Sequence, residues 1–417
     1  MRQMLSLVGT LLPVVLSGCG GSKPAVGTAA APTQIGPSQT SLSGMAGGTV
    51  LGQTSGRFTV SPYLLTPRAG HTTTLLPDES LLVTGGGILN TEDVLEPSIR
   101  SETLNSSGAA TPTGFLNFAR QFHTATLLRN GRVVIAGGNP GSNVFPDATA
   151  TAELYDPSTR QYTVIGSMTA ARVGHTASLL PDGRVLIFGG AASGIPSAEI
   201  YDPANGTFTS LPSPSSLRSG HTATVLASGQ VLFTGGRDST GATLATAEMY
   251  DPLTNSFATV GSMGERRAQH TATLLPNGKV LVAGGGVVSI PGAGYTNIIA
   301  FPQEVPGVVS QTAELFDPKT AVFTSIGTMN SARSSHTATL LQDGTVLLCG
   351  GLKGWSNGYF SDNTAEIYDP AAGSFKSAGT MNTGKFWHTA TLLPNGTVAL
   401  VGGVSQDYTL LVVERFK

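Results

Sequence analysis

The sequence predicts an all-β chain that folds as a seven-bladed β-propeller with four-stranded blades. Three observations predict it: the histidines recur in one frame, a double glycine follows each of them at a constant interval, and a cation precedes each of them. The composition agrees, because 54 glycines, 25 prolines and only 12% charged residues suit many short strands joined by tight turns rather than long helices.

The frame contains every histidine of the chain, namely His71, His123, His175, His221, His270, His336 and His388. Fourteen residues after each histidine, a glycine pair begins at Gly85, Gly137, Gly189, Gly235, Gly284, Gly350 and Gly402. Three residues before each histidine stands a cation: Arg68, Arg120, Arg172, Arg218, Arg267, Arg333 and Lys385. Seven units of about 50 residues predict a radial array in which each unit is one supersecondary motif.

Each unit is predicted to contain four strands, A to D. Strand A is the alternating H-T-A-T-L-L segment, and a turn such as Pro181-Asp182-Gly183 leads into strand B, the apolar run before the glycines. Strand C has the pattern Ala-Glu-x-Tyr-Asp-Pro, and an aromatic residue six positions after that aspartate opens strand D. Radial packing would bury both faces of such small sheets and leave only short edges exposed.

The two ends of the repeat region predict how the ring closes. The last repeat stops after strand C, at residues 412–416, so it has no strand D of its own. The segment 57–60 supplies a replacement, because Phe58 precedes Arg68 by the same ten residues that separate Tyr162 from Arg172. We therefore expect the N-terminal strand to complete the last blade. The first repeat is degenerate, with Ala110 where its strand D aromatic should stand.

The N-terminus indicates an extracytoplasmic destination. Arg2 and an apolar run from Met4 to Leu16 are typical of a signal peptide, and Leu16-Ser17-Gly18-Cys19 resembles the bacterial lipobox. That resemblance implies cleavage after residue 18 and a lipid anchor on Cys19, at the outer membrane if the cell is Gram-negative. We expect a signal peptide at 1–18, the lipidated Cys19 with a flexible Gly/Ser/Pro-rich tether at 19–56, and the propeller at 57–417. The alternative is an ordinary secretory signal with a chance cysteine.

Double glycine, an aromatic before Asp-Pro and a strand D aromatic together resemble the kelch repeat, in the bacterial form also seen in the propeller of galactose oxidase. The resemblance covers residues 57–417 and implies the fold more than the function. Galactose oxidase needs copper, histidine ligands and a tyrosine cross-linked to a cysteine. Here every histidine belongs to the repeat, and Cys349, directly before Gly350, has the character of a small buried hydrophobe. We therefore predict no metal, no cofactor and no catalytic residue.

The recurring residues are predicted to be structural. Side chains that repeat in every blade lie at different points around a ring, so the histidines and glycine pairs serve each blade separately. The cations are expected to pair with the strand C glutamates Glu153, Glu199, Glu248, Glu314 and Glu366. The alternative is that the cations form a positive rim around the channel, able to attract an acidic ligand.

Ligand binding is predicted on the face that carries the B–C and D–A loops, because the B–C loops vary most in length. The candidate ligand-binding residues there are Tyr295, Arg333, Trp355, Tyr359, Lys385 and Trp387. Exposed aromatic residues suit stacking against a sugar ring or a peptide side chain, and the alternative is that they pack the long loops onto the propeller.

These features favour a lipid-anchored binding module, expected to be monomeric, that recognises a glycan or a protein. A net charge of -2 argues against nucleic acid as a partner. Two alternatives remain open: a carbohydrate-active enzyme, oxidase-like or mutarotase-like, and a structural protein of the cell envelope. An enzyme would be favoured if Glu314 or Glu366 lacked its blade cation and faced the channel mouth.

Overall fold

The computed structural model describes residues 56–90, 94–141, 148–190, 197–287, 308–353, 360–406 and 408–417. The predicted signal peptide, Cys19 and nearly all of the tether lie outside these residues, as do Tyr295, Trp355 and Tyr359. Residues Thr54–Lys417 form one compact unit. Within the described residues, no helix is long and apolar enough to cross a membrane.

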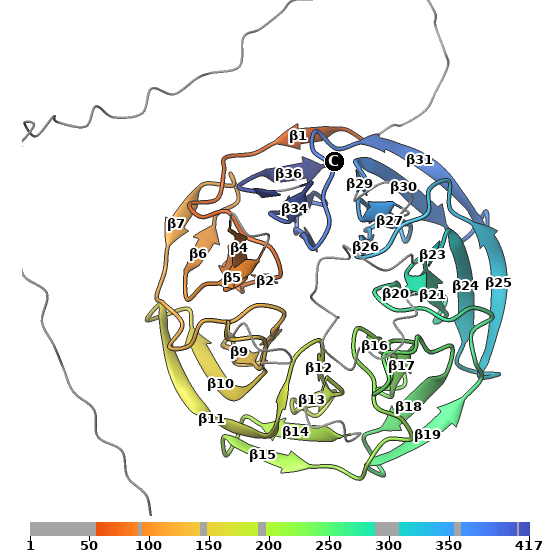
Figure 1. Ribbon diagram of the computed structural model, residues 1–417, viewed down its shortest axis with the longest axis horizontal. Helices are drawn as coiled ribbons and strands as arrows, with labels where there is room; N and C mark the ends of the chain where they lie inside the picture. The colour runs from red at the N-terminus through yellow and green to blue at the C-terminus, as the bar shows by residue number, and fades with distance from the viewer. Residues whose placement is uncertain are drawn as a thin grey trace, which may run out of the picture. The chain divides into compact units, whose positions relative to one another are not determined.

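Seven four-stranded antiparallel sheets surround a central axis (Figure 1), so the prediction of a seven-bladed propeller is confirmed. The first three blades contain β2 (Thr72–Leu75), β3 (Leu81–Thr84), β6 (Ser101–Leu104) and β7 (Ala110–Pro112); β8 (Thr124–Leu127), β9 (Val133–Ala136), β10 (Thr149–Asp156) and β11 (Gln161–Arg172); and β12 (Thr176–Leu179), β13 (Val185–Phe188), β14 (Ala198–Asp202) and β15 (Thr207–Ser210).

Blades 4 to 6 contain β16 (Thr222–Val225), β17 (Val231–Thr234), β18 (Ala247–Asp251) and β19 (Ser256–Val260); β20 (Thr271–Leu274), β21 (Val280–Ala283), β24 (Thr312–Asp317) and β25 (Val322–Thr328); and β26 (Thr337–Leu340), β27 (Val346–Cys349), β30 (Thr364–Asp369) and β31 (Ser374–Thr380). Blade 7 contains β32 (Thr389–Leu392), β33 (Val398–Val401), β36 (Val413–Phe416) and β1 (Phe58–Val60). Strand A of every blade faces the axis, and strand D forms the outer edge (Figure 1).

The N-terminal strand closes the ring as predicted. β1 pairs antiparallel with β36, with Phe58 opposite Phe416, and their ring centroids lie 5.0 Å apart. The blade therefore takes its outer strand from one end of the propeller and its inner strands from the other. Such closure joins the first and last repeats, which would otherwise leave two open sheet faces.

The hydrophobic core lies within and between the blades. All four residues of each strand B are buried, in β3, β9, β13, β17, β21, β27 and β33. One core cluster joins Val134 of blade 2 to Val185 and Ile187 of blade 3, and similar clusters follow around the ring. Burial of strand B on both faces explains why its sequence is a continuous apolar run rather than an alternating one.

The glycine pairs lie where adjacent blades meet. Gly189 and Gly190 both have positive φ, and the Gly190 amide donates to the Arg218 carbonyl of the next blade. A side chain on Gly189 would clash with that carbonyl and approach the His221 ring. The pair is required because only glycine combines this conformation with so close a backbone approach.

Four small hairpins extend the B–C loops on one face. They pair β4 (Gly87–Leu89) with β5 (Leu95–Pro97), β22 (Gly286–Val287) with β23 (Val308–Val309), β28 (Leu352–Lys353) with β29 (Phe360–Ser361), and β34 (Val404–Ser405) with β35 (Tyr408–Thr409). These hairpins, together with the D–A loops, form the face on which the sequence places the binding site.

Candidate functional site

Seven buried ion pairs, one in each blade, hold the D–A loops onto strand C. The N–O distances are 2.6–2.9 Å, and the cation side chains are at most 1% exposed. The pairs are Arg68–Glu102, Arg120–Glu153, Arg172–Glu199, Arg218–Glu248, Arg267–Glu314, Arg333–Glu366 and Lys385–Glu414. Because every cation is enclosed with its carboxylate, the cations form no positive rim around the channel.

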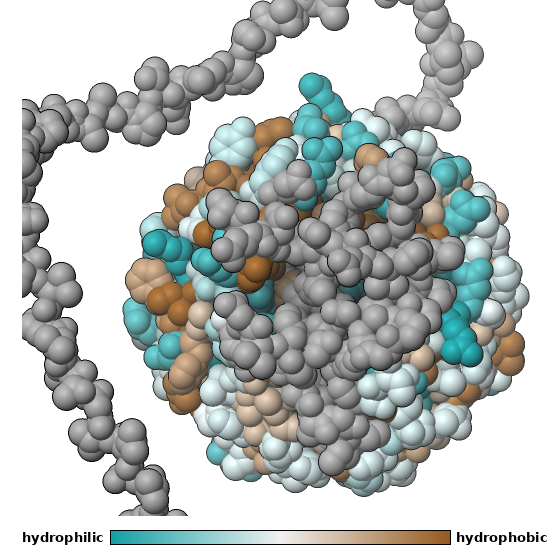
Figure 2. Space-filling view, in the orientation of Figure 1, coloured by the Kyte–Doolittle hydropathy of each residue, from teal (hydrophilic) through white to brown (hydrophobic). Residues whose placement is uncertain are grey.

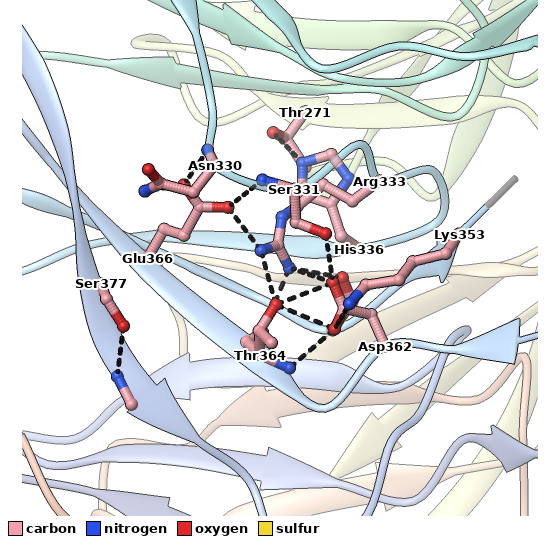
Figure 3. A network of polar contacts seen from close by, with 12 residues as sticks. Thr271, Asn330, Ser331, Arg333, His336, Lys353, Asp362, Thr364, Glu366 and Ser377 are labelled. Carbon is pink, nitrogen blue, oxygen red and sulfur yellow. Dashed lines mark hydrogen bonds and ion pairs between the residues drawn. The ribbon is translucent and has the colours of Figure 1, made fainter.

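Blade 6 shows how each pair is built (Figure 3). Arg333 donates from Nη2 to Glu366 at 2.6 Å and from Nη1 to the Gly350 carbonyl at 2.8 Å. The other Glu366 oxygen accepts the backbone amide of Asn330 at 2.6 Å. One glutamate thus satisfies both the buried guanidinium and an amide of the D–A loop, which is the condition under which a buried charge is tolerated.

The same carboxylate-to-amide contact occurs in all seven blades at 2.6–2.8 Å. It includes Glu102 of the degenerate first repeat, which the strand C pattern in the sequence did not reveal. Glu314 and Glu366, whose pairing state was expected to distinguish an enzyme from a binding module, both carry their blade cation.

Blade 6 adds a second carboxylate, Asp362, at the base of its B–C loop (Figure 3). Its Oδ2 lies 3.4 Å from Arg333 Nη1, and its Oδ1 lies 2.9 Å from Lys353 Nζ. The Asp362 side chain is fully buried, whereas Lys353 is 41% exposed. Blade 5 has Ser310 at this position, and its second carboxylate is Glu265, which accepts from Ser310 Oγ at 2.8 Å and lies 3.8 Å from Arg267 Nη2. In blade 6 the pair of Asp362 with Lys353 fastens β28 and β29 to the propeller.

The seven histidines form a second circuit nearer the axis. Each Nε2 lies 2.9–3.1 Å from the hydroxyl of the threonine that follows the histidine of the preceding blade. Burial, with a neighbouring arginine as the second cause, lowers the pKa of His71, His175 and His270 to about 3. The rings are therefore neutral at pH 7 and serve as hydrogen-bonding links between blades.

The residue immediately before each histidine lies at the mouth of the central channel. These seven residues all have positive φ, and they are Gly70, Phe122, Gly174, Gly220, Gln269, Ser335 and Trp387. Their backbones are joined around the axis: for example, Phe122 N donates to Gly70 O at 2.8 Å, and Ser335 N donates to Gln269 O at 2.9 Å. The mouth is thus a ring of backbone groups whose side chains differ from blade to blade.

Two of the mouth residues are aromatic, and they pack against each other across blade 1. The Phe122 and Trp387 rings meet edge to face, with centroids 5.1 Å apart, and both side chains are half-buried. The Phe122 ring lies against Gly70, where a Cβ would come within 3.0 Å of it. Beneath the pair lies an apolar cluster of Ala69, Leu95, Leu352, Phe386 and Val404.

The opposite part of the mouth carries polar side chains or glycines, which have no side chain. Ser335 Oγ donates to Gln269 Oε1 at 2.7 Å, and Gly174 and Gly220 present only backbone. Below this part of the mouth, the backbones of Ser219 and Arg237 form an antiparallel bridge. The corresponding layer under blades 6, 7 and 1 is the apolar cluster. An aromatic side facing a hydrogen-bonding side is the arrangement that suits a ligand with one apolar and one hydroxylated face.

The structure separates the predicted ligand-binding residues. Trp387 lies at the mouth, whereas Arg333 and Lys385 are fully buried in their ion pairs and hold loops instead. Tyr295, Trp355 and Tyr359 lie outside the described residues. Phe122 was not among the predicted residues, although it precedes His123 as Trp387 precedes His388, and that shared position was the signal that could have found it.

Curated proteins with different names match part of this chain. The chain is 28% identical over 111 residues to tRNA wybutosine-synthesizing protein 4 of Saccharomyces cerevisiae, covering 26% of this chain and 16% of that protein. It is 38% identical over 99 residues to galactose oxidase of Gibberella zeae, covering 22% and 15%. The chain therefore spans less than a fifth of the length of these curated relatives.

Two solved structures share the fold. A fungal alcohol oxidase of the AA5 family, in complex with copper, superposes with a TM-score of 0.67 at 18% identity, covering 87% of this chain and 76% of that one. The structure of YjhT superposes with a TM-score of 0.56 at 12% identity, covering 76% and 99%. At these identities the likeness establishes the propeller alone.

The residues described here do not fit a copper centre. Each histidine Nε2 is already beside a threonine hydroxyl, and the seven rings are distributed around the axis. Among the described residues, no three His, Cys, Asp or Glu side chains are grouped so that they could hold a metal ion. Cys349 is 1% exposed, and burial raises the pKa of its thiol to about 12.

The repeats themselves match a known family. Residues 122–351, more than half of the chain, match the family described as the KLHDC2/KLHL20/DRC7 Kelch-repeats domain. Seven four-stranded blades, double glycines at the blade junctions and a strand D aromatic in six of the seven blades agree with that match. The chain belongs to this kelch-repeat family.

Proposed function

We propose that this protein is a lipid-anchored, extracytoplasmic binding module that recognises a sugar ring at the mouth of its propeller channel. The observation that carries the proposal is the Phe122–Trp387 pair, half-buried at the mouth over an apolar cluster. The C–H face of a pyranose packs well on aromatic rings, and its hydroxyl groups can bond to Gln269, Ser335 and the backbone opposite.

The backbone at this site supports a functional reading of the two aromatic residues. Phe122 and Trp387 each have φ of 52°, in the left-handed region that bulky residues rarely adopt. Three blades place glycine at the same position, which shows that the ring closes without an aromatic side chain. A strained conformation retained at two mouth positions is what selection for ligand contact would produce.

The anchoring part of the proposal rests on the N-terminal sequence. The apolar run that ends in Leu16-Ser17-Gly18-Cys19 suits cleavage before Cys19 and attachment of lipid to its thiol. The absence of an aspartate after Cys19 favours the outer membrane in a Gram-negative cell. The propeller would then act at the envelope surface or in the periplasm.

Three other functions receive less support from the described residues. A carbohydrate-active enzyme would need free acids or bases at the mouth, whereas Glu314 and Glu366 are both paired. In a purely structural envelope protein the aromatic pair would serve only to pack the hairpins of blades 6, 7 and 1 onto the ring, and the binding experiment below separates that role from ligand contact. A protein ligand would use the same face, and the experiment below separates it from a sugar.

The test is binding of the full chain, purified in detergent, to a broad panel of glycans and polysaccharides, with and without Cu²⁺ and Ca²⁺. Phe122→Ser and Trp387→Ser would be compared with wild type, because Ser335 shows that serine is accepted at this position. The control is Phe115→Ser, an exposed aromatic away from the mouth. We expect each mouth substitution to weaken binding about tenfold, or about 1.4 kcal/mol, and the control to leave it unchanged.

The outcomes discriminate between the candidate functions. Metal-independent binding that both mouth variants weaken supports the sugar site. Binding to no glycan under any condition contradicts it and directs the search to a protein partner. Copper-dependent oxidation of a sugar alcohol would instead support the enzyme.

A further inference from the structure

Large hydrophobic side chains are exposed unevenly around the propeller. Nine of the fourteen strongly exposed ones among the described residues lie in loops of blades 7, 1 and 2, on the face that carries the D–A and B–C loops. In the view of Figure 2, hydrophobic residues gather on the left of the rim, near β1 and β7, whereas the opposite rim is mostly pale or hydrophilic.

The repeats provide an internal comparison for this surface. The residue five positions before each blade cation is exposed in all seven D–A loops. It is serine or threonine in five blades (Ser167, Ser213, Ser262, Thr328 and Thr380) but Tyr63 and Phe115 in the loops that enter blades 1 and 2. The fold requires no aromatic residue at this position.

A second position shows the same departure. The residue three positions before the strand C glutamate accepts a backbone hydrogen bond from the neighbouring D–A loop in blades 7 and 1, where it is Leu411 and Ile99. The corresponding residues of blades 2, 4, 5 and 6 are Ala150, Ala245, Gln311 and Asn363. Two neighbouring blade junctions therefore carry large hydrophobic side chains at equivalent positions, whereas the other described junctions carry alanine, glutamine or asparagine there.

Backbone hydrogen bonds hold the two sets of residues together. Leu64, between Tyr63 and Leu65, donates to the Leu411 carbonyl at 2.9 Å, and Leu116, next to Phe115, donates to the Ile99 carbonyl at 2.9 Å. We define the apolar rim as Tyr63, Leu65, Ile99, Phe115, Phe118 and Leu411, whose side chains are 37–59% exposed.

The charge of these segments is also distinctive. Residues 61–67, 98–100, 113–119 and 408–412 contain no acidic residue, and their one cation, Arg100, is exposed next to Ile99. The exposed acidic residue Glu96 lies just outside these segments, three positions before Ile99, and the carboxylates that contact the Leu65 and Phe118 amides, Glu102 and Glu153, are buried in their ion pairs. Tyrosine, phenylalanine and aliphatic residues on separate loop tips are side chains that enter the headgroup region of a bilayer.

The point where the preceding chain joins the propeller also favours a lipid bilayer as the surface that covers the apolar rim. Arg57 exchanges backbone hydrogen bonds with Lys417, and β1 follows directly. Tyr63 comes five residues after Phe58, so it lies within about 17 Å of the start of β1 along the chain. The junction of blades 7 and 1, with Tyr63, is therefore close along the chain to the point where the tether joins the ring.

We propose that the apolar rim rests on the lipid bilayer that holds the Cys19 anchor, an inference that depends on the proposed anchor but not on the sugar site. The rim would fix the orientation of the propeller, with the loops of blades 7, 1 and 2 in the headgroup region and blades 3 to 6 further from the membrane. The lipid chains would supply most of the affinity, and the rim would supply the orientation.

The experiment measures which loops touch lipid in the full chain, reconstituted in vesicles of phosphatidylethanolamine and phosphatidylglycerol. Single cysteines at Tyr63→Cys and Phe115→Cys carry an environment-sensitive fluorophore, and matched controls carry it at the same loop position, Ser262→Cys and Thr328→Cys. Cys349 is 1% exposed and stays unlabelled in the folded protein. We expect a bilayer-embedded quencher to reduce emission at 63 and 115 at least twice as much as at 262 and 328.

Equal quenching at all four sites, or quenching at none, would overturn the contact. Mass spectrometry of the same samples reports the lipid on Cys19, so failure of the anchor is seen separately from failure of the rim. Sedimentation of Tyr63→Ser/Phe115→Ser provides a further check. If wild type is a dimer that the double variant converts to monomer, without bilayer quenching, a second copy covers the rim and the membrane contact is wrong.

Discussion

Phe58, in the first strand of the propeller, stands directly opposite Phe416, in the last, with ring centroids 5.0 Å apart. This contact joins the two ends of the repeat array inside one blade, together with the pairing of Thr59 and Val60 with Arg415 and Glu414. Closure therefore depends on a strand only three residues long, and the aromatic contact is its largest apolar component.

Phe58→Ala is expected to lower the free energy of unfolding by about 2 kcal/mol, less than a fully buried phenylalanine because Phe58 is half-buried. Val60→Ala, in the same strand but 50% exposed, should change it by less than about 0.5 kcal/mol. Denaturant unfolding followed by near-ultraviolet circular dichroism measures both. Equal effects would show that the aromatic contact does not hold the closing strand.

We expect the loss of a buried ion pair to lower the free energy of unfolding more than the loss of an exposed one. Glu199→Gln leaves Arg172 enclosed without its counter-charge, and we expect a loss of about 3 kcal/mol of stability. Asp182→Asn removes a surface pair with Arg184 of nearly the same length, 2.6 Å against 2.7 Å, and should cost less than about 1 kcal/mol. Unfolding midpoints of the two variants test the contrast, and a similar loss in both would contradict it.

The histidine circuit predicts acid-sensitive stability. Burial lowers the pKa of His71, His175 and His270 to about 3, below the value of about 6.5 in the unfolded chain, so unfolding takes up protons between these values. Stability is therefore full above about pH 6.5 and falls as the pH drops towards 3, by up to about 1.4 kcal/mol per pH unit for each ring.

Urea unfolding between pH 7 and pH 5 isolates this effect, because unfolded carboxyl groups titrate mainly below about pH 4.5. The expected result is a midpoint that falls steadily across the range. A constant midpoint would mean that the histidines are not buried as neutral rings.

Cys349 should be inert in the folded protein. It is 1% exposed, and burial raises the pKa of its thiol to about 12, so little thiolate is available. In the Cys19→Ser chain, a thiol reagent at pH 8 should react on unfolding only. Ser262→Cys, at an exposed loop position, is the positive control and should react at once. Rapid reaction of Cys349 in the native state would contradict its burial in β27.

The number of blades, the order of strands and the mode of ring closure could be predicted because each depends on constant spacings between residues that are close in the sequence. Each repeat states its own hydrophobic pattern, turn and glycine pair, and Phe58 keeps the same distance to its cation as its counterparts. The pairing of the cations with strand C glutamates was predictable for five blades. The pairs of Glu102 and Glu414 were not predicted, because their repeats lack the Asp-Pro pattern that marks the strand.

The sequence alone determined that this chain is a seven-fold kelch array, since repeated local patterns are sufficient to specify a repeated motif. Only the tertiary structure decided which of the residues that depart from the repeat pattern contact one another. Ring closure places blade 1 between blades 7 and 2, which brings Trp387 against Phe122 and sets Leu411 beside the loop of Tyr63. It also enclosed Arg333 and Lys385, two predicted ligand contacts. Burial and contact depend on the neighbouring blade, and no pattern within one repeat contains that information.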